Sequence, residues 1–374
     1  MTKDKPIRVA HIIGKWVGGG VESVVMNYYR HIDRSKIQFD FICDSDSTNI
    51  PYEEIKKLGG NVILVSPYQK VFKYHRELKK VLKEGQYQIV HSHINTLSVF
   101  SLCAAKRAGV PVRIAHSHST SNKKEYLKNM LKFILKPFSK LFATNYMACT
   151  EHAGRWLFGD KEFDSGNVFI LNNAIDVEKF KYNEEVRIYK RKALTIAEDS
   201  FVIGHIGRFV EQKNHHFLID VFNEFHNKYS NSVLLLIGQG PLMREIKEKV
   251  NLLGLQEAVQ FLGQRDDVSE LYQAFDLFLF PSLYEGLGMV MIEAQCSGLP
   301  CVASSEVPME SKINNNVYYL SLQKNVDMWV NVLEKNILKK RYTNLQSIKN
   351  LGFEINLEAQ KLAKEYLRNI FEQN

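Results

Sequence analysis

Short apolar runs alternate with longer amphipathic segments along the first half of the chain. Apolar runs that predict buried strands lie at residues 7–13, 39–43, 62–65, 89–93 and 113–115. Segments with helical periodicity lie between them, at residues 21–31, 51–58, 74–83 and 97–108. Strands that alternate with helices predict parallel βαβ units and a doubly wound α/β sheet.

The second half of the chain repeats this pattern. Its apolar runs lie at residues 201–206, 233–237, 259–262, 277–280 and 300–304. A chain of 374 residues exceeds the usual size of one hydrophobic core, so two domains of one architecture are expected. The polar stretch 176–191 marks the linker, and we place the domains at 1–180 and 181–352. The amphipathic C-terminal helix, within 353–374, is expected to pack back on the first domain.

Composition narrows the class of protein. A content of 45% hydrophobic and 24% charged residues is typical of a soluble globular chain. No apolar run reaches the ~20 residues of a membrane-spanning helix, and the N-terminus lacks the apolar core of a signal peptide, so we expect a cytoplasmic protein. The five cysteines have no metal-ligand spacing and predict buried thiols rather than a metal site.

Positive charge is concentrated in the first half. Residues 1–180 carry 27 Lys and Arg against 17 Asp and Glu, whereas residues 181–374 carry 22 against 24. The basic half therefore favours an acidic partner. We see no nucleic-acid-binding motif, so we expect no nucleic acid and retain an anionic membrane surface as a candidate.

The most informative segment is 284–304, YEGLGMVMIEAQCSGLPCVAS. It follows an apolar strand, passes through a loop with two glycines and enters a helix-like stretch. Free N–H groups at such a helix start favour a phosphate, and Gly286 and Gly288 allow a ligand to approach the backbone. Glu285 and Glu293, one on each side of the loop, can accept hydrogen bonds from hydroxyl groups. Phosphate beside hydroxyls predicts a nucleotide-sugar site.

Three further loops each follow a predicted strand. The loop GRFVEQKN, residues 207–214, holds Arg208 and Lys213, which together could neutralise a diphosphate. The loops at 238–241 and 263–267 could each contact a base through their backbones.

Together these motifs closely resemble the retaining glycosyltransferases of family four, which have the GT-B fold of two Rossmann-like domains facing across a cleft. The resemblance covers nearly the whole chain and is strongest over residues 204–304. The segments HSHS at 116–119 and PMES at 308–311 resemble those of the branch that builds bacterial exopolysaccharide and capsule. The resemblance implies a nucleoside-diphosphate sugar donor, most often a UDP-sugar, a saccharide or polyprenyl-linked acceptor, and no metal requirement.

The resemblance also assigns roles to matching residues of the second domain. Glu293 would hold the ribose hydroxyls, Glu285 would lie near the hydroxyls of the donor sugar, and Arg208 with Lys213 would clamp the diphosphate. The other donor-binding residues implied are Gly238, Arg265, Gly286, Leu287, Gly288 and Met289. Glu285 is then a positioning group rather than a nucleophile, because the departing phosphate assists deprotonation of the acceptor.

In the first domain the resemblance implies a glycine loop, Gly18, Gly19 and Gly20, that closes on the phosphates. One histidine at a strand end would touch the donor sugar. We choose His118, with His116 as the alternate, because alternation along a strand places both on one face. Asn173 resembles the asparagine of an NG(I/V)D segment, although Ala174 stands where the family has glycine.

Other classes fit less well. A nicotinamide-dependent oxidoreductase would also be doubly wound, but the run of three glycines is not G-x-G-x-x-G. A sugar-nucleotide epimerase with two Rossmann-like domains and a catalytically inactive carbohydrate-binding partner of another transferase remain as alternatives.

Lysines recur every four residues between residues 123 and 141. Among them Lys124, Lys128 and Lys132 precede Pro137 and share one side of a predicted helix with an apolar opposite side. One interpretation is a solvated outer face. The other is an interfacial helix that docks the basic domain on the anionic inner face of the plasma membrane, where a lipid-linked acceptor would lie.

Overall fold

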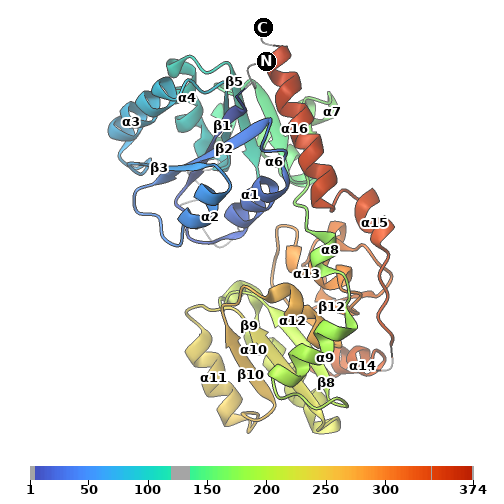
Figure 1. Ribbon diagram of the computed structural model, residues 1–374. Helices are drawn as coiled ribbons and strands as arrows, with labels where there is room; N and C mark the ends of the chain where they lie inside the picture. The colour runs from blue at the N-terminus through green and yellow to red at the C-terminus, as the bar shows by residue number, and fades with distance from the viewer. Residues whose placement is uncertain (1–4, 119–134, 338, 373–374) are drawn as a thin grey trace. The chain divides into compact units, whose positions relative to one another are not determined.

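The computed structural model describes residues 5–118, 135–337 and 339–372, and divides the chain into two compact units. Unit 1 consists of Met1–Ala174 with Gly352–Asn374, and unit 2 of Ile175–Leu351. Each unit contains one parallel sheet covered by helices (Figure 1). The α/β class and the pair of doubly wound sheets predicted from the sequence are confirmed.

Unit 1 is built on a seven-stranded parallel sheet with the order β3-β2-β1-β4-β5-β6-β7. Its strands are β1 (Ile7–Gly14), β2 (Ile37–Asp44), β3 (Asn61–Val65), β4 (Ile89–Ser92), β5 (Val112–Ser117), β6 (Asn145–Ala148) and β7 (Val168–Ile170). Its helices include α1 (Gly20–His31), α2 (Tyr52–Lys57), α3 (Val71–Glu84), α4 (Ser98–Ala108), α6 (Glu151–Phe158), α7 (Asp160–Asp164) and α16 (Ile355–Phe371).

Two hydrophobic clusters cover the two faces of this sheet. One cluster joins β1 and β2 to α1 and α16, with Tyr29, Phe39 and Tyr366 fully buried in it. The other joins the opposite face to α3 and α4 through residues such as Leu78 and Leu102. The last helix of the chain therefore completes the core of the first unit.

Unit 2 is built on a six-stranded parallel sheet with the order β10-β9-β8-β11-β12-β13. Its strands are β8 (Phe201–Ile206), β9 (Ser232–Ile237), β10 (Val259–Gly263), β11 (Leu277–Phe280), β12 (Cys301–Ser304) and β13 (Val317–Leu320). Its helices include α8 (Val177–Phe180), α9 (Glu184–Ala193), α10 (His215–Lys228), α11 (Met243–Leu252), α12 (Val268–Ala274), α13 (Met289–Cys296), α14 (Val326–Glu334) and α15 (Leu345–Asn350).

The division between the units falls after Ala174 rather than at the predicted position, after residue 180. The reason is α8, which packs on unit 2. The ring of Phe180 meets the ring of Tyr272 with centroids 5.8 Å apart, and the Phe180 carbonyl accepts a hydrogen bond from Ser297 Oγ at 2.8 Å. The polar sequence of 176–191 suggested a linker, but apolar side chains such as Phe180 pack it on the hydrophobic core of unit 2.

Three short strands, β6, β7 and β13, were not predicted from the apolar runs. Each has four residues or fewer and is only partly buried, whereas β4, β11 and β12 are as short but fully buried. Across the described ranges, no helix is both long enough and apolar enough to cross a membrane.

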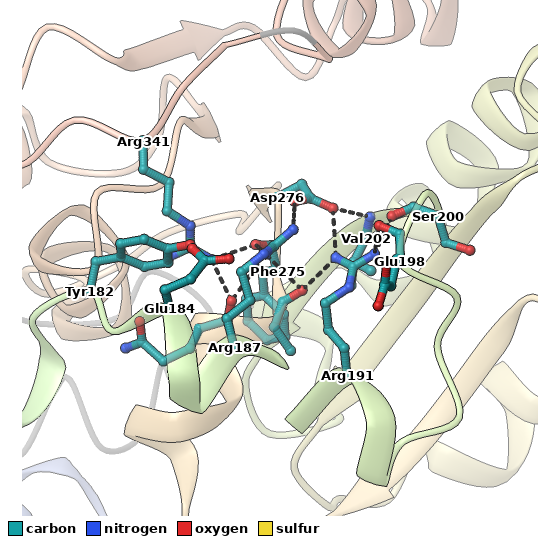
Figure 2. Close-up of polar contacts among 12 residues, drawn as sticks. Tyr182, Glu184, Arg187, Arg191, Glu198, Ser200, Val202, Phe275, Asp276 and Arg341 are labelled. Carbon is teal, nitrogen blue, oxygen red and sulfur yellow. Dashed lines mark hydrogen bonds and ion pairs between the residues drawn. The ribbon is translucent and has the colours of Figure 1, made fainter. Parts of the chain in front are cut away.

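Three arginines surround the C-terminal end of α12 (Figure 2). Arg187 and Arg191 of α9 both bind the carboxylate of Asp276, at 2.5 and 3.1 Å. Arg341 lies in the segment after α14. Its side chain reaches the C-terminal end of α12 and donates to the carbonyl oxygens of Tyr272 and Gln273, at 3.0 and 2.6 Å. The positive guanidinium groups stabilise the negative end of the helix, and their N–H groups donate hydrogen bonds to its last carbonyl oxygens.

We expect Arg341→Met to destabilise unit 2 by about 2–4 kcal/mol, because it removes the charged donor to the carbonyl groups of Ser297 and Tyr272. Burial lowers the pKa of Arg341 to about 9, so the side chain is charged at neutral pH. The measurement is the midpoint of chemical denaturation. Lys340→Met is the matched control, since Lys340 is exposed. An Arg341 variant that unfolds at the same denaturant concentration as this control would contradict the expectation.

Candidate functional site

The carboxyl ends of β8, β9 and β10 carry three loops that are hydrogen-bonded to one another. The N–H of Gly207 donates to Ile237 O at 2.9 Å, that of Phe209 to Gln239 O at 3.0 Å, and that of Gly238 to Gly263 O at 2.8 Å. Since all strands run parallel, the loops share one edge of the sheet. This edge is where doubly wound sheets bind their ligands.

Gly238 has a structural reason to be glycine. Its φ is +134°, and a Cβ built on it would lie 2.1 Å from the carbonyl oxygen of Gly207. Gly240 is equally crowded, with a Cβ position 2.4 Å from Phe209 O. Close backbone packing therefore explains both glycines of this loop, and the predicted contact of Gly238 with a nucleotide stays a prediction.

Lys213 and Glu285 form an ion pair, with Nζ and Oε1 2.6 Å apart. The Lys213 side chain is 15% exposed and that of Glu285 is 8% exposed, so the pair lies in a largely dry environment. The ammonium group also lies 4.9 Å from the centroid of the Phe280 ring. Two residues predicted from separate motifs, 72 positions apart, thus meet at one point.

Gln212, which sequence analysis passed over, fixes this pair. Its backbone carbonyl accepts from Leu283 N at 2.8 Å, and its side-chain amide donates to Tyr284 O at 3.0 Å. The same amide lies 3.4 Å from Glu285 Oε2. The loop after β8 and the loop after β11 are therefore held together as one surface.

Arg208 differs from Lys213. Its side chain is exposed, and within the described part of the chain it makes no hydrogen bond or ion pair. The predicted diphosphate clamp thus combines one cation that is already fixed with one that is available to a ligand.

Helix α13 begins directly after Gly288, whose φ of +80° is in the left-handed region that favours glycine. The backbone at Gly286 faces open space, whereas Leu287 is buried in the core. Met289 is the first residue of the helix. The loop therefore presents backbone beside the helix N-terminus, as the sequence suggested for a phosphate site.

Glu293 lies in the second turn of α13 and accepts a hydrogen bond from the hydroxyl group of Tyr272 at 2.9 Å. Burial raises the pKa of Glu293 to about 7. Tyr272, from α12, is fully buried and was not predicted. A carboxyl group that titrates near neutral pH at the edge of a site is a functional candidate.

Arg265 does not lie free in its loop. It forms a bidentate ion pair with Asp267, at 2.8 and 2.7 Å, and Asp267 also binds Lys190 at 2.6 Å. The guanidinium group beside it holds the pKa of Asp267 well below its usual range. If Arg265 contacts a base as predicted, it would do so with the side of its guanidinium group that does not face Asp267.

The glycine loop of unit 1 is folded over a carboxylate. Glu22, the third residue of α1, is buried and accepts a hydrogen bond from Val17 N at 3.0 Å. A Cβ on Gly19 would lie 2.9 Å from Glu22 Oε2, whereas Gly20 faces open space and Gly18 has φ of +78°. An acidic residue in the first turn is favourable at the positive end of the helix dipole.

Five buried histidines share one face of the unit 1 sheet: His11, His91, His93, His116 and His118. The rings of His116 and His118 stack with centroids 3.9 Å apart. Of the five, His116 and His118 were the candidates chosen from the sequence. His11 and His91 join them because the strand register pairs these two residues directly.

Asn173 lies at the end of unit 1, and its Oδ1 atom is buried with no hydrogen-bond partner among the described residues. The neighbouring Ala174 is buried and does not adopt a positive φ, so its backbone does not need glycine. The predicted membrane-docking residues Lys124, Lys128 and Lys132 lie outside the described residues.

Comparison with known proteins gives consistent results. Residues 186–350 match the family model described as "Glycosyl transferases group 1", and residues 18–179 match "Glycosyltransferase Family 4". The chain is 38% identical over 336 residues to Bacillus subtilis EpsF, which is named as a glycosyltransferase, covering 88% of this chain and 87% of that protein.

More distant relatives extend the match over almost the full length. A UDP-Gal:alpha-D-GlcNAc-diphosphoundecaprenol alpha-1,3-galactosyltransferase of Escherichia coli is 25% identical and covers 96% of this chain and 97% of its own. The crystal structure of Anabaena HepE with UDP and glucose is 19% identical, with a TM-score of 0.80 over 97% of this chain and 100% of that one. The chain therefore belongs to the glycosyltransferases with the GT-B fold.

Proposed function

We propose that this glycosyltransferase moves a sugar from a UDP-sugar to a saccharide or polyprenyl-linked saccharide, with retention of configuration, in the synthesis of an exopolysaccharide or capsule. The observation that carries the proposal is the arrangement in unit 2 of the Lys213–Glu285 pair, the α13 N-terminus and Glu293. The names of the relatives, one acting on UDP-Gal and one binding UDP and glucose, support the choice of nucleotide.

The proposed donor site divides into three parts. Glu293 accepts hydrogen bonds from the ribose hydroxyls, and the backbone of 286–289 faces the phosphates. Arg208 and Lys213 neutralise the charge that develops on the diphosphate as the bond to the sugar breaks, which is the main catalytic contribution expected when a diphosphate leaves. Glu285 holds a sugar hydroxyl group and, through its ion pair, the position of Lys213.

Unit 1 supplies the acceptor side in this proposal. His118 contacts the donor sugar, and His116, stacked behind it, is the alternate. The loop of Gly18, Gly19 and Gly20 would approach the phosphates with its exposed backbone, because Glu22 already occupies the inner side.

A thermal-shift screen of UDP-, GDP- and ADP-sugars tests the donor. A ligand at 100 times its Kd stabilises the protein by about 2.7 kcal/mol, which such a screen detects. Release of nucleoside diphosphate with and without lipid-linked acceptor then tests transfer. Interconversion of the sugar with no release of UDP would indicate an epimerase, and binding without turnover under any acceptor would indicate an inactive carbohydrate-binding partner.

We also propose that the basic unit 1 attaches reversibly to the anionic inner face of the membrane. Residues 1–180 carry an excess of ten positive charges, and each lysine near such a surface can contribute about 1 kcal/mol. Sedimentation with vesicles should show binding to anionic but not neutral lipid, and loss of binding at high salt. Changing Lys124, Lys128 and Lys132 to Gln should weaken it. Equal sedimentation with both lipids would reject the electrostatic attachment.

A further inference from the structure

The buried histidines of unit 1 form two separate hydrogen-bonded chains. In the first, His11 Nδ1 and His93 Nε2 lie 2.9 Å apart, and His93 Nδ1 and His118 Nε2 lie 2.8 Å apart. Each of these contacts needs one nitrogen with a proton and one without. The protonation pattern of the three rings is therefore linked, and one tautomer choice sets the others.

The second chain runs beside the first. Tyr366 of α16 places its hydroxyl oxygen 2.6 Å from His91 Nδ1, and His91 Nε2 lies 2.9 Å from His116 Nδ1. No hydrogen bond joins this chain to the first among the described residues. The two chains can therefore be perturbed separately.

A metal ion explains the cluster less well than hydrogen bonds do. Ring nitrogens of His93, His116 and His118 come within 4.8 Å of one another. However, a metal requires in-plane lone pairs that converge on one point, and the rings of His116 and His118 stack at 25° with their planes nearly parallel. The nitrogens that face each other along the chains are already paired at hydrogen-bond distance.

The inner end of the first chain sets its direction. His11 Nε2 has no partner in the described part of the protein, and its ring packs on Phe39 with centroids 3.9 Å apart. A proton there would be a buried N–H without an acceptor, which proteins avoid more strictly than an unpaired acceptor. Both end nitrogens of this chain, His11 Nε2 and His118 Nδ1, are buried without a partner among the described residues, but the His118 ring is the more exposed of the two, at 8% against 1%. We therefore place the remaining proton on His118, so that His11 Nδ1–H donates to His93 Nε2 and His93 Nδ1–H donates to His118 Nε2.

At the outer end this order leaves a proton on His118 Nδ1, which has no acceptor among the residues described. His118 is also the least buried of the five, at 8% exposed against 1–5% for the others. Its backbone is fixed on both sides, with its N–H donating to Asn95 Oδ1 at 2.9 Å and its carbonyl facing Cys149 Sγ at 3.4 Å.

We propose that His11 and His93 are positioning residues that hold His118 in its Nδ1–H form, so that His118 offers a neutral hydrogen-bond donor to an oxygen of the donor sugar. This inference rests on the proposed function and adds to it two residues and a defined tautomer. Burial lowers the pKa of His118 and of His11 to about 3, in agreement with a chain of neutral rings. Aligned imidazole dipoles would strengthen the outer donor.

The tautomer is tested directly by long-range 1H–15N correlation spectra of the full-length protein labelled with 15N-histidine, near neutral pH and without ligand. His118→Asn identifies the signals of His118. We expect a protonated Nδ1 and an unprotonated Nε2 for His118. A protonated Nε2, a doubly protonated ring or the shifts of a metal-bound nitrogen would overturn the proposal.

The role of His93 is tested with two variants of similar volume. His93→Leu removes the donor to His118, whereas His93→Asn retains an N–H near the position of Nδ1. We expect His93→Leu to lose the fixed His118 tautomer and to lower kcat about tenfold with little change in KM for the donor, and His93→Asn to recover most of both. Equal kcat and unchanged His118 signals in the two variants would overturn the relay.

Two control variants separate the effect of His93→Leu on kcat from a general disturbance of the core of unit 1. Tyr29→Phe removes partly buried hydrogen bonds to Gln38 and Leu58 at the same core and should leave kcat unchanged. Tyr366→Phe should alter the signals of His116 and leave those of His118 as they are.

If no nucleotide sugar is turned over, the proposed function fails, but the spectra still decide the relay. If wild type transfers sugar and His93→Leu equals it, only the relay fails.

Discussion

Replacing Lys213 with methionine is expected to reduce turnover of the sugar nucleotide by about 100- to 1000-fold, the usual loss when one group aimed at the developing charge is removed. Arg208→Ala is expected to have an effect of the same order. Methionine keeps an unbranched side chain of similar length but removes the ammonium group, which lies over the Phe280 ring, so the comparison isolates the charge. The measurement is kcat and kcat/KM for release of the nucleoside diphosphate.

The two variants should differ in stability. Lys213→Met leaves Glu285 without its cation in a site where that side chain is 8% exposed, so its melting temperature should fall. Arg208→Ala should melt with the wild type, because Arg208 is exposed. Arg244→Ala, which removes an exposed arginine paired with Glu248 on α11, is the matched control and should change neither quantity. Wild-type turnover in either clamp variant would reject the clamp.

Affinity for the sugar nucleotide is expected to rise about tenfold between about pH 6 and about pH 8, and then to level off. The pKa of Glu293 is raised to about 7 by burial, so the group is mostly protonated at the lower pH. Ribose hydroxyls favour the ionised carboxylate, which accepts both of their hydrogen bonds. Binding below about pH 7 therefore releases a proton from Glu293.

Calorimetry in two buffers of different ionisation enthalpy measures this proton release. Glu293→Gln should bind more weakly and lose the pH dependence, whereas Glu285→Gln should keep it and chiefly slow transfer. A diphosphate esterified to the sugar does not titrate in this range, so the sugar nucleotide is the ligand to use rather than free UDP. Proton release that persists in Glu293→Gln would place the titrating group elsewhere.

The same shift affects the unliganded protein in the opposite direction. A carboxyl group whose pKa is higher in the folded than in the unfolded state binds more protons when folded, so it favours the fold at low pH. That contribution is complete below the ordinary pKa of glutamate and is lost as the pH rises through about 7. Ligand affinity and intrinsic stability therefore have opposite pH slopes at this residue.

The fold could be predicted from the sequence because short apolar runs and their alternation with longer amphipathic segments are local signals. The short strands β6, β7 and β13 were missed because they are only partly buried, whereas β4, β11 and β12 have four residues each but are fully buried. The domain boundary was placed late because α8 is polar in sequence but is held to unit 2 by Phe180.

Some residues of the candidate site were named from the sequence, but the contacts between them could not be. Lys213 and Glu285 were both singled out, yet their ion pair joins two loops 72 positions apart, which no local pattern reveals. The histidine chains depend on strand register, since His11 meets the others only because β1 pairs with β4. Gly238 was predicted to contact the ligand. The structure shows a second reason for glycine at this position, which is the close approach of the Gly207 carbonyl group.

Helix α16 has a consequence for how the protein is made. It contributes Leu362 and Tyr366 to the core of unit 1, although residues 175–351 separate it from the rest of that unit. A ribosome therefore completes the sequence of unit 2 before it has supplied the last helix of unit 1. Until α16 is synthesised, the apolar face that includes Tyr29 and Phe39 stays uncovered in the nascent chain, and chaperones bind surfaces of this kind. Synthesis begins with unit 1, but unit 2 is the first that can finish folding.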